Sequence, residues 1–308
     1  MPLLRSLFIS LSTNRPIRRF SEASSMGRKM SSRFVAGVRM EDALHAARQL
    51  NQQGMSVTLD SLGESVTSEA DAQRAAEIYH RLLDQIAQQN LNANISVKLT
   101  QMGMEFAPEL TETIVRSLAE HCRTTGNFLR IDMEGSALTQ STLDMVRRVH
   151  ALPGNAGHIG IVIQAYLYRS QQDIAQLVAD GIRIRLCKGA YQEPATVAFP
   201  AKSDVDQNYV RLAETLLSSA IYHGIATHDE AMIRAVQHYA STQGIAADRF
   251  EFQMLYGVRR DLQRKLVQEG YRVRIYLPFG SEWYPYFMRR LAERPANVFF
   301  ILRNLFRA

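Results

Sequence analysis

The chain alternates short apolar runs with longer segments in which apolar residues recur every three or four positions. The apolar runs number eight and lie at 55–62, 95–100, 128–133, 159–167, 182–187, 224–228, 250–255 and 273–277. Several are rich in β-branched residues and short enough for strands, where such side chains pack well on the pleated surface. The pattern therefore predicts eight strands.

The segments between these runs are typical of amphipathic helices. Helical spacing is found at 68–89, 110–121, 203–221, 230–239, 258–268 and 282–292, and a further helix is expected at 40–52. Ser203 and Asp204 are interpreted as N-caps, whose side-chain oxygens accept from the first backbone N–H groups. Glycines follow five helical segments, where a left-handed residue commonly ends a helix. They are Gly126, Gly181, Gly224, Gly244 and Gly270.

Strands that alternate with helices indicate parallel βα units. Eight such units in about 250 residues favour a (β/α)8 TIM-like barrel, with a doubly wound open sheet as the alternative. We expect residues 1–54 to form additional N-terminal helices as an arm packed on the barrel, and residues 55–308 to form the catalytic barrel itself. The amphipathic tail 296–308 is expected to be a closing helix.

The first forty residues are rich in Arg and Ser, and Glu22 is their only acid. This composition resembles a mitochondrial transit peptide. We favour a cationic amphipathic helix at 3–11 that packs on the body of the protein, and contact with a membrane surface is a third interpretation. No apolar run has the length that a transmembrane helix requires.

The composition narrows the class of protein. With 308 residues, 46% of them hydrophobic, the chain can form one large domain with a sizeable core. A net charge of +6 suits an anionic membrane surface, cofactor or substrate better than nucleic acid, because no basic tract with interleaved aromatic residues accompanies it. Cys122 and Cys187 are too few for a metal cluster or disulfide framework, so a reducing, cytoplasmic compartment is expected, with peripheral contact at the inner membrane face as an option.

Polar residues stand near the end of nearly every predicted strand. In a (β/α)8 barrel these ends meet at one face, which carries the catalytic groups. Single members have structural explanations, such as an ion pair between Lys98 and Asp132, but their common position predicts one polar pocket. The set is Glu64, Lys98, Asp132, Glu134, Gln164, Arg183, Arg185, Lys188, Thr227, His228, Gln253 and Tyr276.

A pair of arginines, Arg289 and Arg290, follows the last strand on a predicted helix. Paired guanidiniums suit a planar carboxylate, which arginine grips through two parallel hydrogen bonds. Ordinary exposed pairs with Glu293 are the structural alternative. Tyr276 and Trp283 are expected to wall a small apolar ring, so this segment predicts a binding site for a small amino or imino acid.

The segment RIRLCKGAY, residues 183–191, is the second strong element. Lys188 and Gly189 follow a strand, where a cation and backbone N–H groups can meet phosphate oxygens. Donors from Arg185 and Gln164 can engage the polar edge and N5 of a flavin ring. The sequence contains no G-x-G-x-x-G after a strand, no Walker A, no H-E-x-x-H and no G-x-S-x-G, and its His and Cys residues do not cluster for a metal.

Taken together, these motifs resemble the proline dehydrogenase family in its bacterial single-function form. RIYLPFGSEWYPYFMRRLAE, RLCKGAY, ISVKLT, RIDMEG, VIQAYL, GIATHD and FEFQMLYG are similar to that family's segments in sequence and order, over roughly residues 59–297. The resemblance implies a flavin-binding (β/α)8 barrel that uses FAD to oxidise L-proline to Δ1-pyrroline-5-carboxylate, with hydride transfer to flavin N5 and electron transfer to a quinone. No aldehyde dehydrogenase domain accompanies it, which implies a separate pyrroline-5-carboxylate dehydrogenase for the next step.

The resemblance also assigns roles to residues at matching positions. Asp132 and Arg185 are implied to be catalytically important. Substrate contacts are implied for Lys98, Tyr191, Leu255, Tyr276, Arg289 and Arg290, and Glu64 is implied to close the site through an ion pair with one of the two arginines. Contacts with FAD are implied for Met133, Gln164, Arg185, Lys188, Gly189, Ala190, Thr227 and His228.

Two other functions fit parts of the sequence. A Schiff-base aldolase on the same barrel would use Lys98 or Lys188 as its nucleophile. A non-catalytic protein that binds a membrane surface or nucleic acid would use the positive charge, with strongly salt-dependent binding. This last function leaves the polar strand ends unexplained.

Overall fold

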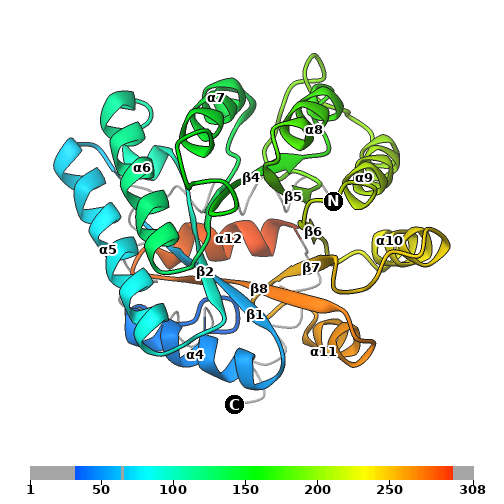
Figure 1. Ribbon diagram of the computed structural model, residues 1–308, viewed down its shortest axis with the longest axis horizontal. Helices are drawn as coiled ribbons and strands as arrows, with labels where there is room; N and C mark the ends of the chain where they lie inside the picture. The colour runs from blue at the N-terminus through cyan, green and yellow to red at the C-terminus, as the bar shows by residue number, and fades with distance from the viewer. Residues whose placement is uncertain (1–31, 64–65, 294–308) are drawn as a thin grey trace.

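Eight parallel strands close into a barrel within residues 32–63 and 66–293, the part of the chain that the computed structural model describes (Figure 1). Neighbours in the chain are neighbours in the barrel, and β1 also pairs with β8. The strands are β1 (Ser56–Ser61), β2 (Ala93–Val97), β3 (Leu129–Ile131), β4 (Ile159–Gln164), β5 (Arg183–Cys187), β6 (His223–Ala226), β7 (Phe250–Leu255) and β8 (Arg272–Phe279). The predicted (β/α)8 barrel is confirmed, since an open sheet would have two unpaired edges.

Helices follow the first seven strands in turn around the outside of the barrel, whereas the first described helix precedes β1 and the last crosses behind the strands in this view (Figure 1). They are α4 (Met40–Gln52), α5 (Glu69–Gln88), α6 (Pro108–Thr124), α7 (Thr139–His150), α8 (Ser170–Ala179), α9 (Lys202–Leu217), α10 (Glu230–Thr242), α11 (Arg260–Gln268) and α12 (Trp283–Glu293), with short 3-10 turns η1 (Thr100–Met102) and η2 (Ser136–Leu138). The sequence pattern missed α7 and α8. The apolar stripe of α8 is weak, because this helix buries only Ile174 and Leu177 as large apolar residues. In contrast, α7 does bury an apolar stripe, formed by Leu143, Met145, Val146 and Val149.

The longest of these helices shows how the sequence specifies its element. Ser68 is the N-cap of α5, and its hydroxyl accepts from the Asp71 backbone N–H at 3.2 Å. Along the helix, Ala72, Ala76 and Tyr79 recur at helical spacing and are buried against the barrel. The Tyr79 hydroxyl reaches through to Asp60 inside β1, so a core-facing helix residue also supports the polar interior.

Two local predictions are wrong. Ser203 and Asp204 lie inside the first turn of α9, which begins after the extended residue Ala201 without a side-chain cap; an acid there still favours the positive end of the helix dipole. Gly224 does not end a helix but lies in β6. Glycine is needed at this position because an added Cβ would lie 2.3 Å from Gln253 Nε2 inside the barrel. The other four glycines do adopt positive φ.

The last strand runs two residues past its predicted end at Leu277 and includes Pro278. Proline lacks the backbone N–H that a central strand position normally donates. A backbone N–H at position 278 would point towards β7, but β7 has already ended at Leu255, opposite Tyr276. Proline at this position therefore costs the sheet no hydrogen bond. The Pro278 carbonyl instead accepts from the Ala36 N–H at 2.9 Å, which attaches the segment before α4 to the barrel.

The described part of the N-terminal arm consists of residues 32–54, in which α4 packs against β1 and β8. The segment 3–11 and the tail 296–308 lie outside the described residues, so their predicted helices stay predictions. In the portions of the chain that can be described, no helix combines the length and the apolar character needed to span a bilayer.

His223 at the start of β6 is buried in an unusual electrostatic setting. Its Nδ1 accepts from the Ile184 N–H at 3.0 Å, and its Nε2 lies 2.9 Å from Ser219 Oγ. Burial, with the positive charges of Arg130 and Arg183, lowers the pKa of His223 to about 3. The folded protein therefore keeps this imidazole neutral at pH values where the unfolded chain protonates it.

We expect His223 to make folding pH-dependent below the usual histidine pKa of about 6.5. Between that pH and about 3 the unfolded chain binds the extra proton, so the free energy of unfolding falls with falling pH by roughly 1.4 kcal/mol per unit. His223→Asn keeps an acceptor for Ile184 and should lose less stability than wild type between pH 6.5 and 5. Urea unfolding at several pH values measures both slopes, and identical slopes would contradict the assignment.

Candidate functional site

Charged residues from four strands or strand ends, together with Tyr276 from a fifth, meet inside the C-terminal mouth of the barrel, the end where the strands finish. Asp132 follows β3, and its Oδ1 accepts from Arg185 Nη1 at 2.8 Å and from Ser96 Oγ at 2.6 Å. Its Oδ2 lies 2.8 Å from Tyr276 Oη and 3.9 Å from Lys98 Nζ. The structure thus brings together Asp132, Arg185, Lys98 and Tyr276, as the strand ends predicted.

Asp60 in β1 completes this cluster and was not predicted. Its carboxylate is fully buried, with Oδ2 lying 2.7 Å from Tyr276 Oη and 3.2 Å from Lys98 Nζ. The signal in the sequence was an acid within the apolar run 55–62, which is costly unless it is paired. The strand-end pattern indicates Glu64 as the polar end of the first strand and assigns no role to Asp60.

The Tyr276 hydroxyl lies between the two carboxylates. A phenol has a single proton and donates to one acceptor at a time. Burial, with the negative charges of Asp132 and Asp60, raises the pKa of Tyr276 well above its usual value, so the hydroxyl stays protonated and acts as a donor. The Arg185 guanidinium carbon lies 5.3 Å from the centre of the Tyr276 ring, which holds the ring from a second side.

Gln164 at the end of β4 supplies an amide group with an unused acceptor. Its Nε2 donates to the Met133 carbonyl at 3.3 Å, while Oε1 is buried without a hydrogen-bond partner among the described residues. A buried polar atom without a partner is costly and commonly marks a ligand position. A flavin ring, which has one N–H donor and several acceptors at its polar edge, matches both ends of this amide.

The loop after β5 carries the predicted phosphate-binding residues. Lys188 Nζ pairs with Asp206 and with Asp229, the latter at 2.9 Å. Gly189 has a φ of 116°, and an added Cβ would lie 2.4 Å from the Tyr166 ring, so only glycine fits this turn. Ala190 is exposed, and Tyr191, 44% exposed, is not brought into the Asp132 cluster.

The ends of β6 and β7 form a hydrogen-bonded wall beside the cluster. The Leu255 N–H donates to His228 Nε2 at 2.9 Å, which leaves the proton of a neutral imidazole on Nδ1. Thr227 is buried, and its Oγ1 accepts from the Asp229 N–H at 3.0 Å. Gln253 in β7 accepts from Arg185 Nε, so this wall also orients the guanidinium.

The helix that follows β8 carries the predicted carboxylate clamp. Arg289 and Arg290 lie in α12, but their side chains and the whole of Glu64 fall outside the described residues. Trp283 does not wall the site as predicted. It is buried against Phe287, with ring centres 5.8 Å apart, in an aromatic cluster that also includes Phe34. This packing anchors α12 to the segment before α4.

The alternatives from the sequence lose support. Lys98 and Lys188 both form ion pairs with carboxylates, whereas a Schiff-base nucleophile needs an amine that is available to attack a carbonyl. Among the residues that the structure describes, no three His, Cys, Asp or Glu side chains are grouped to hold a metal ion.

Comparison with known proteins gives a consistent result. The family model described as proline dehydrogenase matches residues 43–303. The chain is 39% identical to Proline dehydrogenase 1 of Bacillus subtilis, over 98% of this chain and 99% of that protein. It is 43% identical to Proline dehydrogenase of Deinococcus radiodurans, over 90% of each chain.

Solved structures of longer proteins share the fold. Proline utilization A (PutA) from Bdellovibrio bacteriovorus, inactivated by N-propargylglycine, aligns with a TM-score of 0.81 and 27% identity over 86% of this chain and 32% of its own. PutA of Bradyrhizobium japonicum aligns with a TM-score of 0.76 and 25% identity over 88% of this chain and 31% of its own. This chain therefore spans about a third of those longer proteins. Because the family model matches most of the chain and single-function proline dehydrogenases match it over nearly their full length, the chain belongs to the proline dehydrogenase family.

Proposed function

We propose that this chain is a single-function proline dehydrogenase, which oxidises L-proline to Δ1-pyrroline-5-carboxylate at the C-terminal mouth of its barrel. The observation that carries the proposal is the buried cluster of Asp132, Arg185, Lys98 and Tyr276. These residues come from four different strands or strand ends, and the resemblance to the family implied a role for each. Within the family, this is the first step of proline catabolism.

We propose FAD as the cofactor of this site. When bound, the flavin would supply a two-electron acceptor at N5 for the hydride of a proline ring carbon, with a quinone as the later acceptor of the electrons. Two observations support the assignment: the amide oxygen of Gln164 has no hydrogen-bond partner within the described part of the chain, and the turn at residue 189 can be formed only by glycine. The residues proposed to hold FAD are Met133, Gln164, Arg185, Lys188, Gly189, Ala190, Thr227 and His228.

The charge balance of the cluster indicates how the substrate would bind. Asp60 and Asp132 are matched by Lys98 and Arg185, so a proline carboxylate brings one unmatched negative charge into the mouth. We propose that Arg289 and Arg290 supply the compensating charge beside Lys98, and that Glu64 pairs with one of them to close the site. Leu255, Tyr276 and Tyr191 are proposed to border the apolar ring.

The protein's own groups would prepare the substrate. The ring nitrogen must be unprotonated before its carbon can lose a hydride, and the carbon must be held in line with the acceptor. The cluster fixes both side chains that face the substrate: the Tyr276 hydroxyl lies within hydrogen-bond distance of both carboxylates, and Arg185 donates to Asp132. A cation beside the reacting ring, Arg185, stabilises the negative charge that develops there.

The acceptor and partners follow from the same proposal. A quinone resides in the membrane, so we propose peripheral contact with the inner membrane face, supported by the net charge of +6. Bifunctional PutA proteins match this chain over only 24% of their length, and we propose that a separate pyrroline-5-carboxylate dehydrogenase consumes the product here.

Purified protein should carry flavin absorption bands, and these should bleach when L-proline is added without oxygen. The reason is that proline donates two electrons to the bound cofactor in a single turnover. Bands that persist with proline would reject the substrate and retain the cofactor. Protein that binds no flavin even after FAD is added would reject the whole proposal.

Tyr276→Phe removes the hydroxyl between Asp60 and Asp132. Loss of a hydrogen bond to a charged group costs about 1.5–3 kcal/mol, so kcat/KM for proline should fall roughly ten- to hundredfold and its pH dependence should change. Steady-state oxidation with an artificial electron acceptor across pH measures both effects. Flavin content should stay at the wild-type level, and an unchanged pH profile with unchanged kcat/KM would leave the hydroxyl with no role in the reaction.

Gly189→Ala should lower the flavin content of the purified protein severalfold, because the new Cβ meets the Tyr166 ring at 2.4 Å and must displace the loop. Gly126→Ala is the matched control, since Gly126 also has positive φ but nothing lies within 4 Å of its added Cβ. The ratio of flavin to protein absorbance compares the two variants. Equal ratios would show that the turn at Gly189 does not hold the cofactor.

A further inference from the structure

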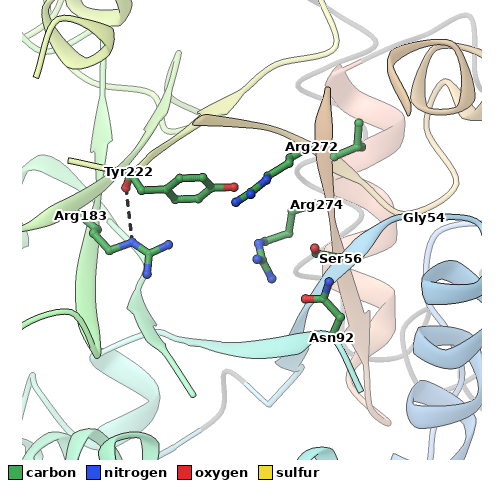
Figure 2. A pocket seen from close by; sticks show the side chains of 8 residues that line it. Gly54, Ser56, Asn92, Arg183, Tyr222, Arg272 and Arg274 are labelled. Carbon is green, nitrogen blue, oxygen red and sulfur yellow. Dashed lines mark hydrogen bonds between the residues drawn. The ribbon is translucent and has the colours of Figure 1, made fainter. Parts of the chain in front are cut away.

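A cavity of about 330 Å³ opens at the N-terminal mouth of the barrel, the end where the strands begin (Figure 2). Its lining comes from the first residues of β1, β5 and β8 and from residues just before β2 and β6. The cavity lies at the opposite end of the strands from the Asp132 cluster, and the proposed function does not use it. Its size is sufficient for a small ligand. The polar side chains in the lining are Ser56, Asn92, Arg183, Tyr222, Arg272 and Arg274.

Three guanidinium groups line this one space. Figure 2 shows Arg183 and Arg274 on facing sides of it, with Arg272 near the rim. Arg274 is tied to the barrel, because its Nε pairs with Glu251 at 2.7 Å and its Nη1 donates to the Val57 carbonyl at 2.8 Å. Arg272 lies 3.8 Å from the exposed Asp248, and Arg183 forms no ion pair with any described residue.

A fourth arginine lies next to the cavity lining. Arg130 is buried in β3, and its Nη1 donates to the carbonyls of Ile161 and Arg183. Among the described residues, Glu251 and Asp248 are the only acids paired with these four guanidiniums, which leaves two positive charges without an acidic partner. Burial lowers the pKa of Arg183. The charge of Glu251 opposes this effect, and the charge of Arg274 acts in the same direction as burial.

Aromatic neighbours hold the guanidiniums in place, and Tyr222 also engages one donor on each of two arginines. Its carbonyl accepts from Arg183 Nε at 3.4 Å (Figure 2), and its hydroxyl accepts a hydrogen bond from Arg272. The Arg183 Cζ lies 4.4 Å from the Phe128 ring centre and 4.9 Å from the Tyr222 ring centre. Arg272 Cζ lies 5.5 Å from the same Tyr222 ring. Stacking on a ring engages the flat face of a guanidinium and leaves its in-plane N–H groups for a planar or tetrahedral anion.

A glycine makes room for this arrangement. An added Cβ at Gly160 would lie 2.3 Å from the Arg183 carbonyl and 2.8 Å from Arg130 Nη1. Gly160 does not have positive φ, so the requirement is for space and not for an unusual backbone conformation. The absence of a side chain at this position of β4 therefore allows the Arg130 guanidinium to approach the Arg183 backbone.

We propose that the N-terminal mouth binds a compact phosphoryl anion with two or more negative charges, either a free phosphate or pyrophosphate or the phosphate group of a small metabolite. Among the described residues, Arg183 in the lining and Arg130 beside it have no acidic ion-pair partner, which favours such an anion over a monocarboxylate with its single negative charge. Several guanidiniums around one space suit tetrahedral oxygens, which accept hydrogen bonds in several directions. Asn92 and Ser56 add neutral polar groups beside them.

Such a ligand would link β5 to β8 and stabilise the folded barrel by binding only the native state. The test titrates the flavin-loaded protein with inorganic phosphate and with pyrophosphate by calorimetry, at constant ionic strength. The cofactor keeps its own phosphate site occupied during the titration. Wild type should show saturable binding of one anion per chain.

Arg272→Gln is the informative variant, because this side chain is exposed and its contacts with the fold are a long ion pair to Asp248 and the side chain of Tyr222. Its affinity for phosphate and pyrophosphate should fall about tenfold or more, as expected when a charge-assisted hydrogen bond is lost. Arg272→Lys keeps the positive charge but lacks the paired N–H donors of a guanidinium, so its affinity for the anions should lie between those of wild type and Arg272→Gln. Arg234→Gln is the control, since Arg234 is exposed and paired with Glu230 on the distant helix α10 at 3.5 Å, and it should bind like wild type.

Three results would overturn the proposal. They are the absence of saturable binding in wild type, equal affinity in wild type and Arg272→Gln, and tighter binding of succinate than of phosphate, which would make the cavity a carboxylate site. Bleaching of the flavin by proline should be the same in Arg272→Gln and wild type. A failure of proline oxidation is therefore measured separately from a failure of anion binding.

Discussion

Burying two carboxylates side by side is the constraint on which the catalytic end of this barrel depends. Asp60 and Asp132 would repel each other and lose their hydration if they were not matched by Lys98, Arg185 and the Tyr276 hydroxyl. Removing one member of such a set leaves an uncompensated buried charge, at a cost on the order of 3–5 kcal/mol. The strands that carry these residues are thereby held in one arrangement, and the arrangement is also the proposed reaction site.

The interior of the barrel continues this polar chemistry from one mouth to the other. Arg185 donates to Gln253, whose amide donates to Glu251 at 2.6 Å. Glu251 in turn pairs with Arg274 at the N-terminal mouth. Each member satisfies its neighbour, so the orientation of Gln253 is defined from both sides. One hydrogen-bonded chain therefore joins the Asp132 cluster to the arginine-lined cavity, and the helices outside supply the apolar core.

The two mouths of the barrel differ in the number of acidic side chains that pair with their cationic side chains. At the C-terminal mouth Asp60 and Asp132 balance two cations, so a substrate carboxylate needs the further positive charge proposed for α12. At the N-terminal mouth the arginines outnumber their acidic partners among the described residues. An anion entering the first mouth must be matched by new cations, whereas an anion entering the second relieves repulsion that the fold already holds.

The sequence by itself determined the number and order of the strands and most of the polar residues of the site, because period and strand-end position are local properties. Asp132 and Lys98 could be placed at one face once eight parallel units were recognised. Only the tertiary structure showed that Asp60 completes the cluster, that Gly224 makes room for Gln253, and that the N-terminal mouth gathers arginines from β5 and β8. These features depend on which side chains meet across the barrel, and residues far apart in the sequence meet only when the sheet closes.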